Sequence, residues 1–355
     1  MEVSMISSVQ NQSAANKKHI LFADFDNTQL LTKEQSAVVT YQNILSNLAL
    51  QNLSNNGDIN LIHCTGRVFS DIHRDIKSGH HSQLPFPTAA QTPHIICGVG
   101  TEIYTLNNLG EYELDTQWDK KLKETGFEDA IKSFTVKING RIISHFCHLI
   151  ENTLGADINL KPQDDSKNTN LKKSMWGEIK GSDHFTNDEL KTAVQKTLHA
   201  VCKFEDDQKI EVTTSIQSGK IAIDLTPKGA NKHEACMYLA GKLGYTPDEI
   251  WAAGDSLNDG HCIHLSGANV IVVGNAQADL IKAIHNENKA AHVNFAKLEN
   301  EAASGIIECL EHANIITHKA IISAQNEACT KMSDIQNYFV DYPETKSQNP
   351  YKHYY

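Results

Sequence analysis

Two carboxylates, Asp24 and Asp26, end a short apolar run and are the residues of this chain best suited to chemistry. Residues 20–23 read as a buried strand, which is followed at once by polar Asn27 and Thr28. Carboxylates at i and i+2 repel one another unless a cation lies between them. The pair therefore indicates a hard metal ion held by oxygen ligands, with one carboxylate free to react. The structural alternative is that Asp24 caps a turn and Asp26 caps a helix.

Three more polar segments follow apolar stretches farther along the chain. Thr65-Gly66-Arg67 ends a strand candidate at 59–64, and Gly254-Asp255-Ser256-Leu257-Asn258-Asp259 follows another at 250–253. Between them, a lysine (Lys228 or Lys232) opens a predicted helix at 231–243. Carboxylates, a hydroxyl and a lysine together are typical of phosphoryl transfer, because a phosphate ester needs its negative charge neutralised before an anion can attack it.

Each group has a role in that reaction. A metal ion bound by Asp24, Asp255 and a backbone carbonyl would orient the phosphorus for in-line attack. Asp24 would attack and form an aspartyl-phosphate, while Asp26 protonates the leaving oxygen and later deprotonates the incoming water. Thr65 and the lysine would bind the equatorial oxygens, where charge accumulates in the transition state.

The elements that must position these residues alternate between strand and helix, which predicts an α/β fold with a parallel sheet. The expected strands are residues 20–23, 59–64, 94–97, 250–253 and 269–273. The chain becomes more polar after residue 110, with strand candidates at 134–138 and 141–143 and helices at 126–132 and 188–201. We therefore expect a lead at 1–16 that is disordered, a core made of 17–110 and 213–310, an inserted α+β domain at 111–212, and a C-terminal helix (315–338) with a polar tail in 311–355.

Composition limits the class of protein. The 355 residues carry a net charge of −11, which argues against a nucleic-acid binder. The eight cysteines include no C-x-x-C pair and fit reduced thiols better than disulfides or a zinc site. No segment approaches the ~20 apolar residues of a membrane span, and residues 1–16 lack the apolar region of a signal peptide. We expect a cytoplasmic protein, with export without a cleavable signal left open.

The four segments, in their order, resemble the motifs of the haloacid dehalogenase superfamily: D-x-D-x-T, then Ser or Thr, then Lys, then G-D-x-x-x-D. The resemblance implies a Rossmann-like core with a parallel sheet, Mg²⁺ as the cofactor, and a phosphatase acting on a small phosphorylated substrate. The long middle segment implies a cap of the large, C2 type between the second and third motifs.

Within that superfamily the chain is most similar to sucrose-phosphate phosphatases, over about residues 18–310. The segment 98–104 with Trp118 resembles that family's G-T-E-I segment and the tryptophan after it. Residues 160–163 with Lys172 resemble the cap segment that helps to hold the sugar. Residues 223–232, 273–277 and 303–307 also follow the family pattern.

The resemblance implies roles for further residues. It makes Lys232 the catalytic lysine, with Lys228 as the alternative, and it places Asp259 behind the metal ligands Asp24, Asp255 and the backbone carbonyl of Asp26. The residues expected to contact the substrate are Thr28, Gly66, Arg67, Gly100, Thr101, Glu102, Gln163, Lys172 and Asn258.

The chain departs from the family in the cap. It has Lys167-Asn168 where a Glu-Gln pair is usual, His233 where a glycine follows the catalytic lysine, and Lys173-Ser174-Met175-Trp176 in a segment that is usually rich in tyrosine. The leading hypothesis is a phosphatase for a sugar phosphate or similar small phosphate. The alternatives are a phosphotyrosyl-protein or phosphoinositide phosphatase on the same core, and a non-catalytic binding module. A protein or membrane partner at the C-terminal tail has no motif to support it.

Overall fold

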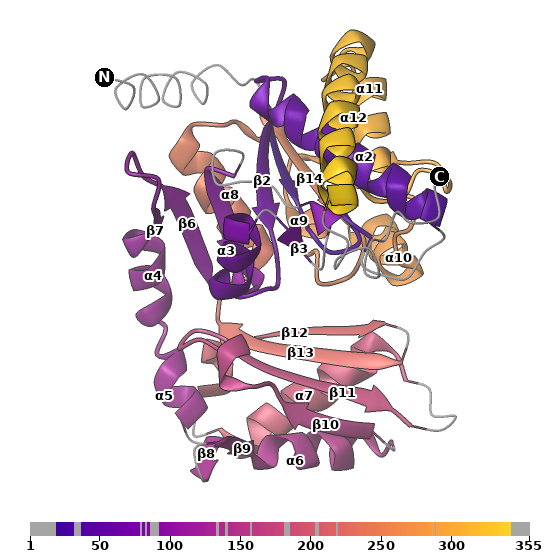
Figure 1. Cartoon of the computed structure of the whole chain (residues 1–355). Coiled ribbons are helices and arrows are strands. Elements are labelled where there is room, and N and C mark those ends of the chain that lie inside the picture. The colour runs from indigo at the N-terminus through magenta and orange to yellow at the C-terminus, as the bar shows by residue number, and fades with distance from the viewer. Residues whose placement is uncertain are drawn as a thin grey trace.

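The computed structural model describes residues 19–31, 37–78, 80–81, 84–85, 92–132, 135–138, 141–156, 158–180, 185–202, 206–217, 219–287 and 289–341. The predicted N-terminal lead (1–16) and the polar tail beyond residue 341 lie outside these residues. The described chain forms two units, a larger one built on an eight-stranded sheet and a smaller one built on a four-stranded sheet (Figure 1).

The eight-stranded sheet has the order β16-β15-β14-β1-β2-β5-β6-β7. It is parallel from β16 to β5 and antiparallel from β5 through β7. Its strands are β1 (Ile20–Ala23), β2 (Asn60–Cys64), β5 (His94–Cys97), β6 (Glu102–Leu106), β7 (Tyr112–Leu114), β14 (Ile250–Gly254), β15 (Asn269–Val272) and β16 (His292–Phe295). The five predicted strands and the mostly parallel α/β sheet are confirmed.

Helices cover both faces of this sheet, which is why its central strands β1 and β14 consist of buried apolar residues. One face packs against α2 (Ala37–Asn55), α3 (Phe69–Ser78), α11 (Ala302–His312) and α12 (His318–Asp341). The other packs against α4 (Thr116–Lys123), α8 (Lys232–Leu243), α9 (His261–His264) and α10 (Ala278–Glu287). All four residues of β1 are buried, as expected for a central strand.

The smaller unit, which we call the inserted unit, runs from α5 (Phe127–Lys132) to β13 (Lys220–Pro227). Its antiparallel sheet has the order β10-β11-β13-β12. The remaining elements are β8 (Thr135–Ile138), β9 (Arg141–Ser144), α6 (His145–Leu154), β10 (Ile158–Pro162), β11 (Lys173–Ile179), α7 (Asn187–Val201) and β12 (Ile210–Gln217). Helices α6 and α7 pack on one face of the sheet through a separate apolar cluster, and the other face is turned toward the larger unit (Figure 1).

The predicted limits of the insertion, 111 and 212, do not coincide with the limits of this sheet. Strand β7 pairs with β6 in the larger sheet, and Trp118 and Leu122 of α4 are buried in the apolar cluster of the larger unit. At the other end, residue 212 falls inside β12, which pairs with β13 along its whole length. Polarity along the chain put the predicted limits at β7 and β12 because the polar residues of these strands alternate with apolar ones. We therefore place the passages between the units at 124–126 and 228–231.

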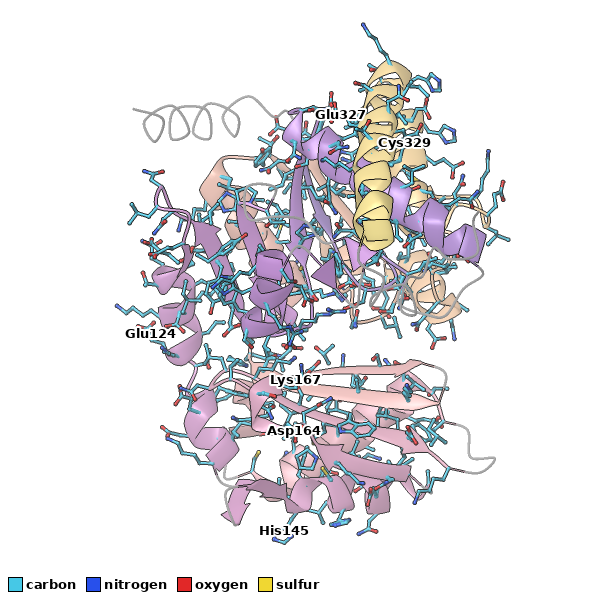
Figure 2. All side chains as sticks on the ribbon, viewed as in Figure 1. Glu124, His145, Asp164, Lys167, Glu327 and Cys329 are labelled. Carbon is cyan, nitrogen blue, oxygen red and sulfur yellow. The ribbon has the colours of Figure 1, made fainter. Side chains whose placement is uncertain are left out.

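The predicted C-terminal helix corresponds to α12, which begins at His318 rather than Ile315. It packs along α2, where Asn52 Nδ2 donates to Ala324 O at 3.0 Å and Lys331 Nζ donates to Asn52 Oδ1 at 2.6 Å (Figure 1). Glu327 and Cys329 mark this helix in Figure 2. All eight cysteines are free thiols. A search of the described helices finds none with the length and apolar character that a bilayer crossing requires.

Candidate active site

The sheet order brings the predicted acidic residues together at one edge. Strand β1 lies between β2 and β14, with Ala23 opposite His63 on one side and Ala253 on the other. The residues that follow these strands must therefore be neighbours, since parallel strands end on the same side. Asp24 N donates to Ala253 O at 3.0 Å, and Asp255 and Thr65 follow the two flanking strands.

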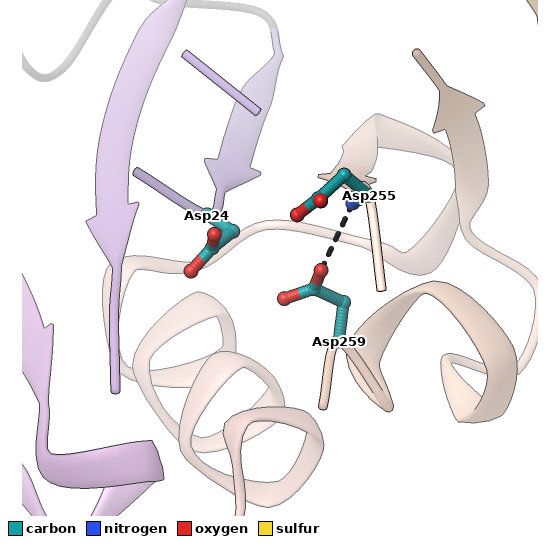
Figure 3. A group of neighbouring side chains, drawn as sticks. All are labelled: Asp24, Asp255 and Asp259. Atoms are coloured by element: carbon teal, nitrogen blue, oxygen red, sulfur yellow. Dashed lines mark hydrogen bonds between the residues drawn. The ribbon is translucent and has the colours of Figure 1, made fainter. Parts of the chain in front are cut away.

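Three buried carboxylates meet at this edge: Asp24, Asp255 and Asp259 (Figure 3). One oxygen from each lies within 4.8 Å of the others. Asp259 Oδ2 accepts hydrogen bonds from the backbone N–H groups of Asp255 and Ser256, both at 3.0 Å. This turn holds Asp259 against the backbone of Asp255 and Ser256.

Lys232 supplies the positive charge of the group. It is the first residue of α8, and the side chain of Asn231 caps that helix by accepting from Glu234 N. Lys232 Nζ donates to Asp24 Oδ1 at 2.6 Å and to Asp259 Oδ1 at 2.7 Å, and its side chain is only 1% exposed. Lys228, the alternative, is 63% exposed and pairs with Glu211 at 3.1 Å. Of the two lysines, the structure brings Lys232 to Asp24.

The charges in this group do not balance. Burial raises the pKa of Asp24 well above its ordinary value; Lys232 lowers it, and Asp259, Asp255 and Asp26 raise it further. Burial alone would lower the pKa of Lys232, but the carboxylates of Asp24 and Asp259 raise it well above its ordinary value. Three buried carboxylates thus share one ammonium, which leaves excess negative charge where Asp24 and Asp255 face one another.

This excess charge fits a divalent cation. Mg²⁺ prefers oxygen ligands and is typically held by one or two carboxylates together with phosphate oxygens and water. Asp24 and Asp255 would supply the carboxylates, and Lys232 already occupies the inner side of Asp24 and Asp259. Thr28, which was expected to contact the substrate, donates from Oγ1 to Oδ1 of the predicted metal ligand Asp255 at 3.3 Å.

Asp26 is held by an arginine. Arg67 Nε donates to Asp26 Oδ2 at 2.8 Å, and Arg67 Nη2 makes a close contact with Oδ1, so that both carboxylate oxygens are engaged. Asp26 remains 32% exposed. Burial opposes the charged guanidinium, yet Asp26 and then Asp75 raise the pKa of Arg67. The arrangement puts Asp26 at the solvent side of Asp24, where a leaving group could be reached.

Thr65 begins the loop after β2, the strand next to β1, and its hydroxyl is partly occupied. Thr65 Oγ1 accepts from Arg67 N at 3.2 Å, and Thr65 N donates to Ile96 O at 2.8 Å. Gly66 presents its carbonyl oxygen to Lys172 Nζ at 2.7 Å. The bond from Arg67 N uses the Thr65 hydroxyl oxygen as an acceptor and not its proton, which a hydroxyl can still donate.

The inserted unit closes one side of the site. Lys172 reaches from it to Gly66 and also pairs with Asp224 at 3.4 Å. Lys167 makes a close ion pair with Asp71 of α3, and Figure 2 shows it where the two units meet. Between the units lies a cavity of about 470 Å³. Its lining includes eight predicted site residues: Asp24, Asp26, Gly66, Arg67, Gln163, Lys172, Asp255 and Asn258.

Three residues predicted to contact the substrate lie behind this cavity. Gly100 packs on the start of α8: a side chain there would come within 2.3 Å of Asn231 O and 2.9 Å of Lys232 N. Thr101 Oγ1 donates to Gly98 O at 3.0 Å within the same turn. Glu102 accepts a hydrogen bond from Phe69 N at the start of α3, and its pKa is raised chiefly by burial. These contacts favour a supporting role over contact with a substrate.

Several residues that hold the site together were not predicted from the sequence. Gln29 Nε2 donates to Ala23 O and to Asp24 O, both at 3.1 Å, and lies 2.9 Å from His63 Nδ1, which fixes the turn after β1. Asn275 Nδ2 donates to Asn27 O at 2.7 Å in the same turn. Asp75 and Asp224 hold the cations Arg67 and Lys172. Asp224 and Asn275 stand in the segments 223–232 and 273–277 that follow the family pattern. For Asp75 the available signal was a polar residue among the apolar ones of an amphipathic helix.

The model of the sucrose-6F-phosphate phosphohydrolase family matches residues 17–143 and 147–314. Sucrose-phosphatase 2 of Nicotiana tabacum is 30% identical over 128 residues, which is 35% of this chain and 30% of that protein. The mannosylfructose-phosphate phosphatase of Agrobacterium fabrum is 26% identical over 230 residues, or 65% of this chain and 75% of that protein. The chain thus spans about a third of the tobacco relative that it matches.

Among solved structures, the sucrose-phosphatase of Synechocystis, in complex with sucrose and phosphate, aligns with a TM-score of 0.53. The alignment covers 85% of this chain and all of that one, at 21% identity. At this identity the likeness establishes the fold, in agreement with the haloacid dehalogenase-like core expected from the four motifs.

Proposed function

This chain belongs to the sucrose-6F-phosphate phosphohydrolase family, and from that premise we propose that it is a Mg²⁺-dependent phosphomonoester hydrolase acting on a sugar phosphate. The observation that carries the proposal is the meeting of Asp24, Asp255 and Lys232 at the carboxyl end of β1. Every core position that the chemistry needs is filled, so a non-catalytic binding module is disfavoured.

The chain's own residues divide the work. Asp24 attacks the phosphorus and carries the phosphoryl group as an aspartyl-phosphate, while Asp26 gives a proton to the departing oxygen. Lys232 and Thr65 hold the transferring oxygens, and Lys232 keeps Asp24 oriented through its 2.6 Å bond. When Mg²⁺ is bound it neutralises the phosphate and carboxylate charges, and Asp24, Asp255 and the Asp26 carbonyl are the residues that would hold it.

The metal requirement has a readout apart from activity. We expect Mg²⁺ to raise the melting temperature of the protein, since a ligand at 100 times its Kd stabilises a fold by about 2.7 kcal/mol. The shift should disappear in Asp255→Asn, which removes one of the two facing carboxylates. It should persist in Asp279→Asn, a matched change at an exposed position on α10. A shift of equal size in both variants would place the cation elsewhere.

The inserted unit serves as the cap in this proposal. Its sheet forms one wall of the cavity, and Lys172 and Lys167 reach across to the larger unit. A cavity of about 470 Å³ suits a small substrate better than a protein surface, because ligand pockets typically measure about 300–1,000 Å³.

A substrate panel tests the substrate class. With Mg²⁺ we expect sucrose 6-phosphate and related sugar phosphates to have the highest kcat/KM, well above phosphotyrosine peptides and phosphoinositides. A higher kcat/KM for phosphotyrosine peptides or for phosphoinositides would favour the corresponding alternative phosphatase function. Equal, poor rates on all members, including p-nitrophenyl phosphate, would instead support a binding module.

Trp176 is a candidate for recognising the sugar. In β11 it is paired with Lys161 and Ala222, and alternation along the strand puts it on the same face as Ser174. Ser174 and Ala222 line the cavity, whereas Trp176 is 41% exposed. An exposed indole beside a polar cavity offers a flat apolar surface to a sugar ring.

We therefore expect Trp176→Ala to raise KM for sucrose 6-phosphate about tenfold, which corresponds to about 1.4 kcal/mol of lost contact. Because p-nitrophenyl phosphate has no second ring to stack there, its KM should change by less than about twofold, within the range of neutral surface substitutions. Leu109→Ala, at an exposed leucine between β6 and β7, is the control. A parallel rise in both KM values would assign Trp176 to packing.

A further inference from the structure

Asp75 is a charged side chain on the buried face of α3, and no step of the proposed reaction uses it directly. It lies between Ile72 and Ile76 on that face and is only 4% exposed. A carboxylate taken out of water lowers stability unless it is paired and hydrogen-bonded. A carboxylate in this position therefore needs charged or hydrogen-bonding partners that offset the cost of its burial.

Two arginines are among those partners. Asp75 Oδ1 accepts from Arg74 Nε and Nη2, both at 3.3 Å, and Asp75 Oδ2 accepts from Arg67 Nη1 at 3.4 Å. The other edge of the Arg67 guanidinium holds both oxygens of Asp26. Arg67 thus bridges a buried carboxylate on α3 and the carboxylate proposed as acid and base. The Phe25 ring lies beneath it, 5.7 Å from the guanidinium carbon to the ring centroid.

We propose that Asp75 is a positioning residue for proton transfer: it fixes the Arg67 guanidinium, and Arg67 in turn fixes the direction of the Asp26 carboxyl group. The inference rests on the proposed phosphatase function. Proton transfer requires the acid to lie within about 2.6–3.2 Å of the oxygen it serves. Asp26 is one-third exposed, and the hydrogen bonds of its own turn, such as Asn27 N to Leu30 O at 2.8 Å, support the backbone rather than the carboxyl group. A rigid arginine fork held at its far edge supplies that support.

The direction of the Asp26 carboxyl group matters in both halves of the proposed reaction. In the first half, Asp26 as a carboxylic acid gives its proton to the ester oxygen while the P–O bond breaks and the phosphoryl group moves to Asp24. In the second half, Asp26 as a carboxylate takes a proton from the water whose oxygen bonds to phosphorus, releasing Asp24 and inorganic phosphate. The bidentate pair with Arg67 matches the carboxylate form. Both halves need the Asp26 oxygens aimed at the same place.

The test compares leaving groups. A sugar alkoxide leaves poorly and needs the proton, whereas p-nitrophenolate leaves readily without it. We expect Asp75→Asn to lower kcat/KM for sucrose 6-phosphate by about 10- to 100-fold, up to the lower end of what general acid catalysis contributes. The kcat/KM for p-nitrophenyl phosphate should fall by less than about threefold, because the variant keeps its fold and its phosphate-binding residues and this reaction needs no proton from Asp26.

Arg67→Lys should show the same pattern, because an ammonium cannot make the fork to both carboxylates. The kcat/KM of the double variant should be no lower than that of the less active single variant, as expected when Asp75 acts through Arg67. Asp279→Asn is the matched control on α10, and Asp75→Glu, which keeps the charge, should recover part of the loss. If Asp75→Asn does not fold, Arg67→Lys and Asp75→Glu decide the question.

Equal losses on the two substrates would overturn the inference, because they would show that Asp75 and Arg67 act on folding or phosphate binding rather than on the proton. Unchanged turnover of sucrose 6-phosphate in Asp75→Asn would also overturn it. A wild-type protein that hydrolyses neither substrate would overturn the proposed function itself, which distinguishes the two failures.

Discussion

Asp24→Asn should abolish phosphate ester hydrolysis, with kcat reduced by at least about 10⁴-fold, the order found when a covalent nucleophile is removed. An amide has neither the charge nor the nucleophilicity of a carboxylate. Wild-type protein quenched in acid during turnover should carry phosphate on the peptide that contains Asp24, and the variant should not.

The same variant should fold normally. Asp24 is one of three buried carboxylates around Lys232, and burial raises its pKa well above the ordinary value. An amide removes one of these crowded charges, while Lys232 keeps its 2.7 Å bond to Asp259. We therefore expect an unchanged or higher melting temperature in metal-free buffer. Activity that survives the substitution, or activity lost only through unfolding, would contradict the nucleophile assignment.

The core of the site could be predicted because it depends on sequence-local patterns. Short apolar runs ending in Asp24, Thr65 and Asp255 predicted strands whose carboxyl ends meet, and the structure has them on adjacent strands β2, β1 and β14. The choice between Lys228 and Lys232 could not be made from spacing alone. It depends on the turn of Asn231 at the start of α8, which directs Lys232 inward and leaves Lys228 near Glu211.

What lies around the core depends on contacts between distant segments, which leave no local pattern. Gly100 looked like a substrate residue because it stands in a family motif, yet it packs on Asn231, 131 residues along the chain. Arg67 was expected at the substrate, and the structure adds its two carboxylate partners, Asp26 and Asp75. The predicted limits of the insertion fall at β7 and β12 because these strands carry polar residues like those of loops.

Lys232→Met should be the most destabilising of these substitutions and should also inactivate the protein. Removing one partner from a buried ionic group typically costs about 3–5 kcal/mol, since the remaining charges stay buried and unpaired. Lys232 Nζ is shared by Asp24 and Asp259, both buried. Urea unfolding in the presence of a chelator measures the loss, and activity on p-nitrophenyl phosphate measures the effect on turnover.

Lys228→Met is the matched control, because it makes the same change four residues earlier in the chain. Lys228 is 63% exposed and its ion pair with Glu211 faces water, so the change in stability should stay within about 0.5 kcal/mol, as for most surface substitutions. Comparable effects of the two substitutions, on stability or on activity, would refute the assignment of Lys232 as the catalytic lysine.

The environment of Lys232 also determines how pH and Mg²⁺ should change the loss of stability caused by Lys232→Met. Without the ammonium, Asp24 keeps the raised pKa that burial gives it, and ionising such a group opposes folding as pH rises above its unfolded value. The destabilisation by Lys232→Met should therefore be smaller in mildly acidic buffer than in alkaline buffer. Mg²⁺ should stabilise this variant more than the wild type, because a cation then has to balance all three carboxylates by itself. If Mg²⁺ stabilised the variant and the wild type equally, the lysine and the metal ion would not share the three carboxylates.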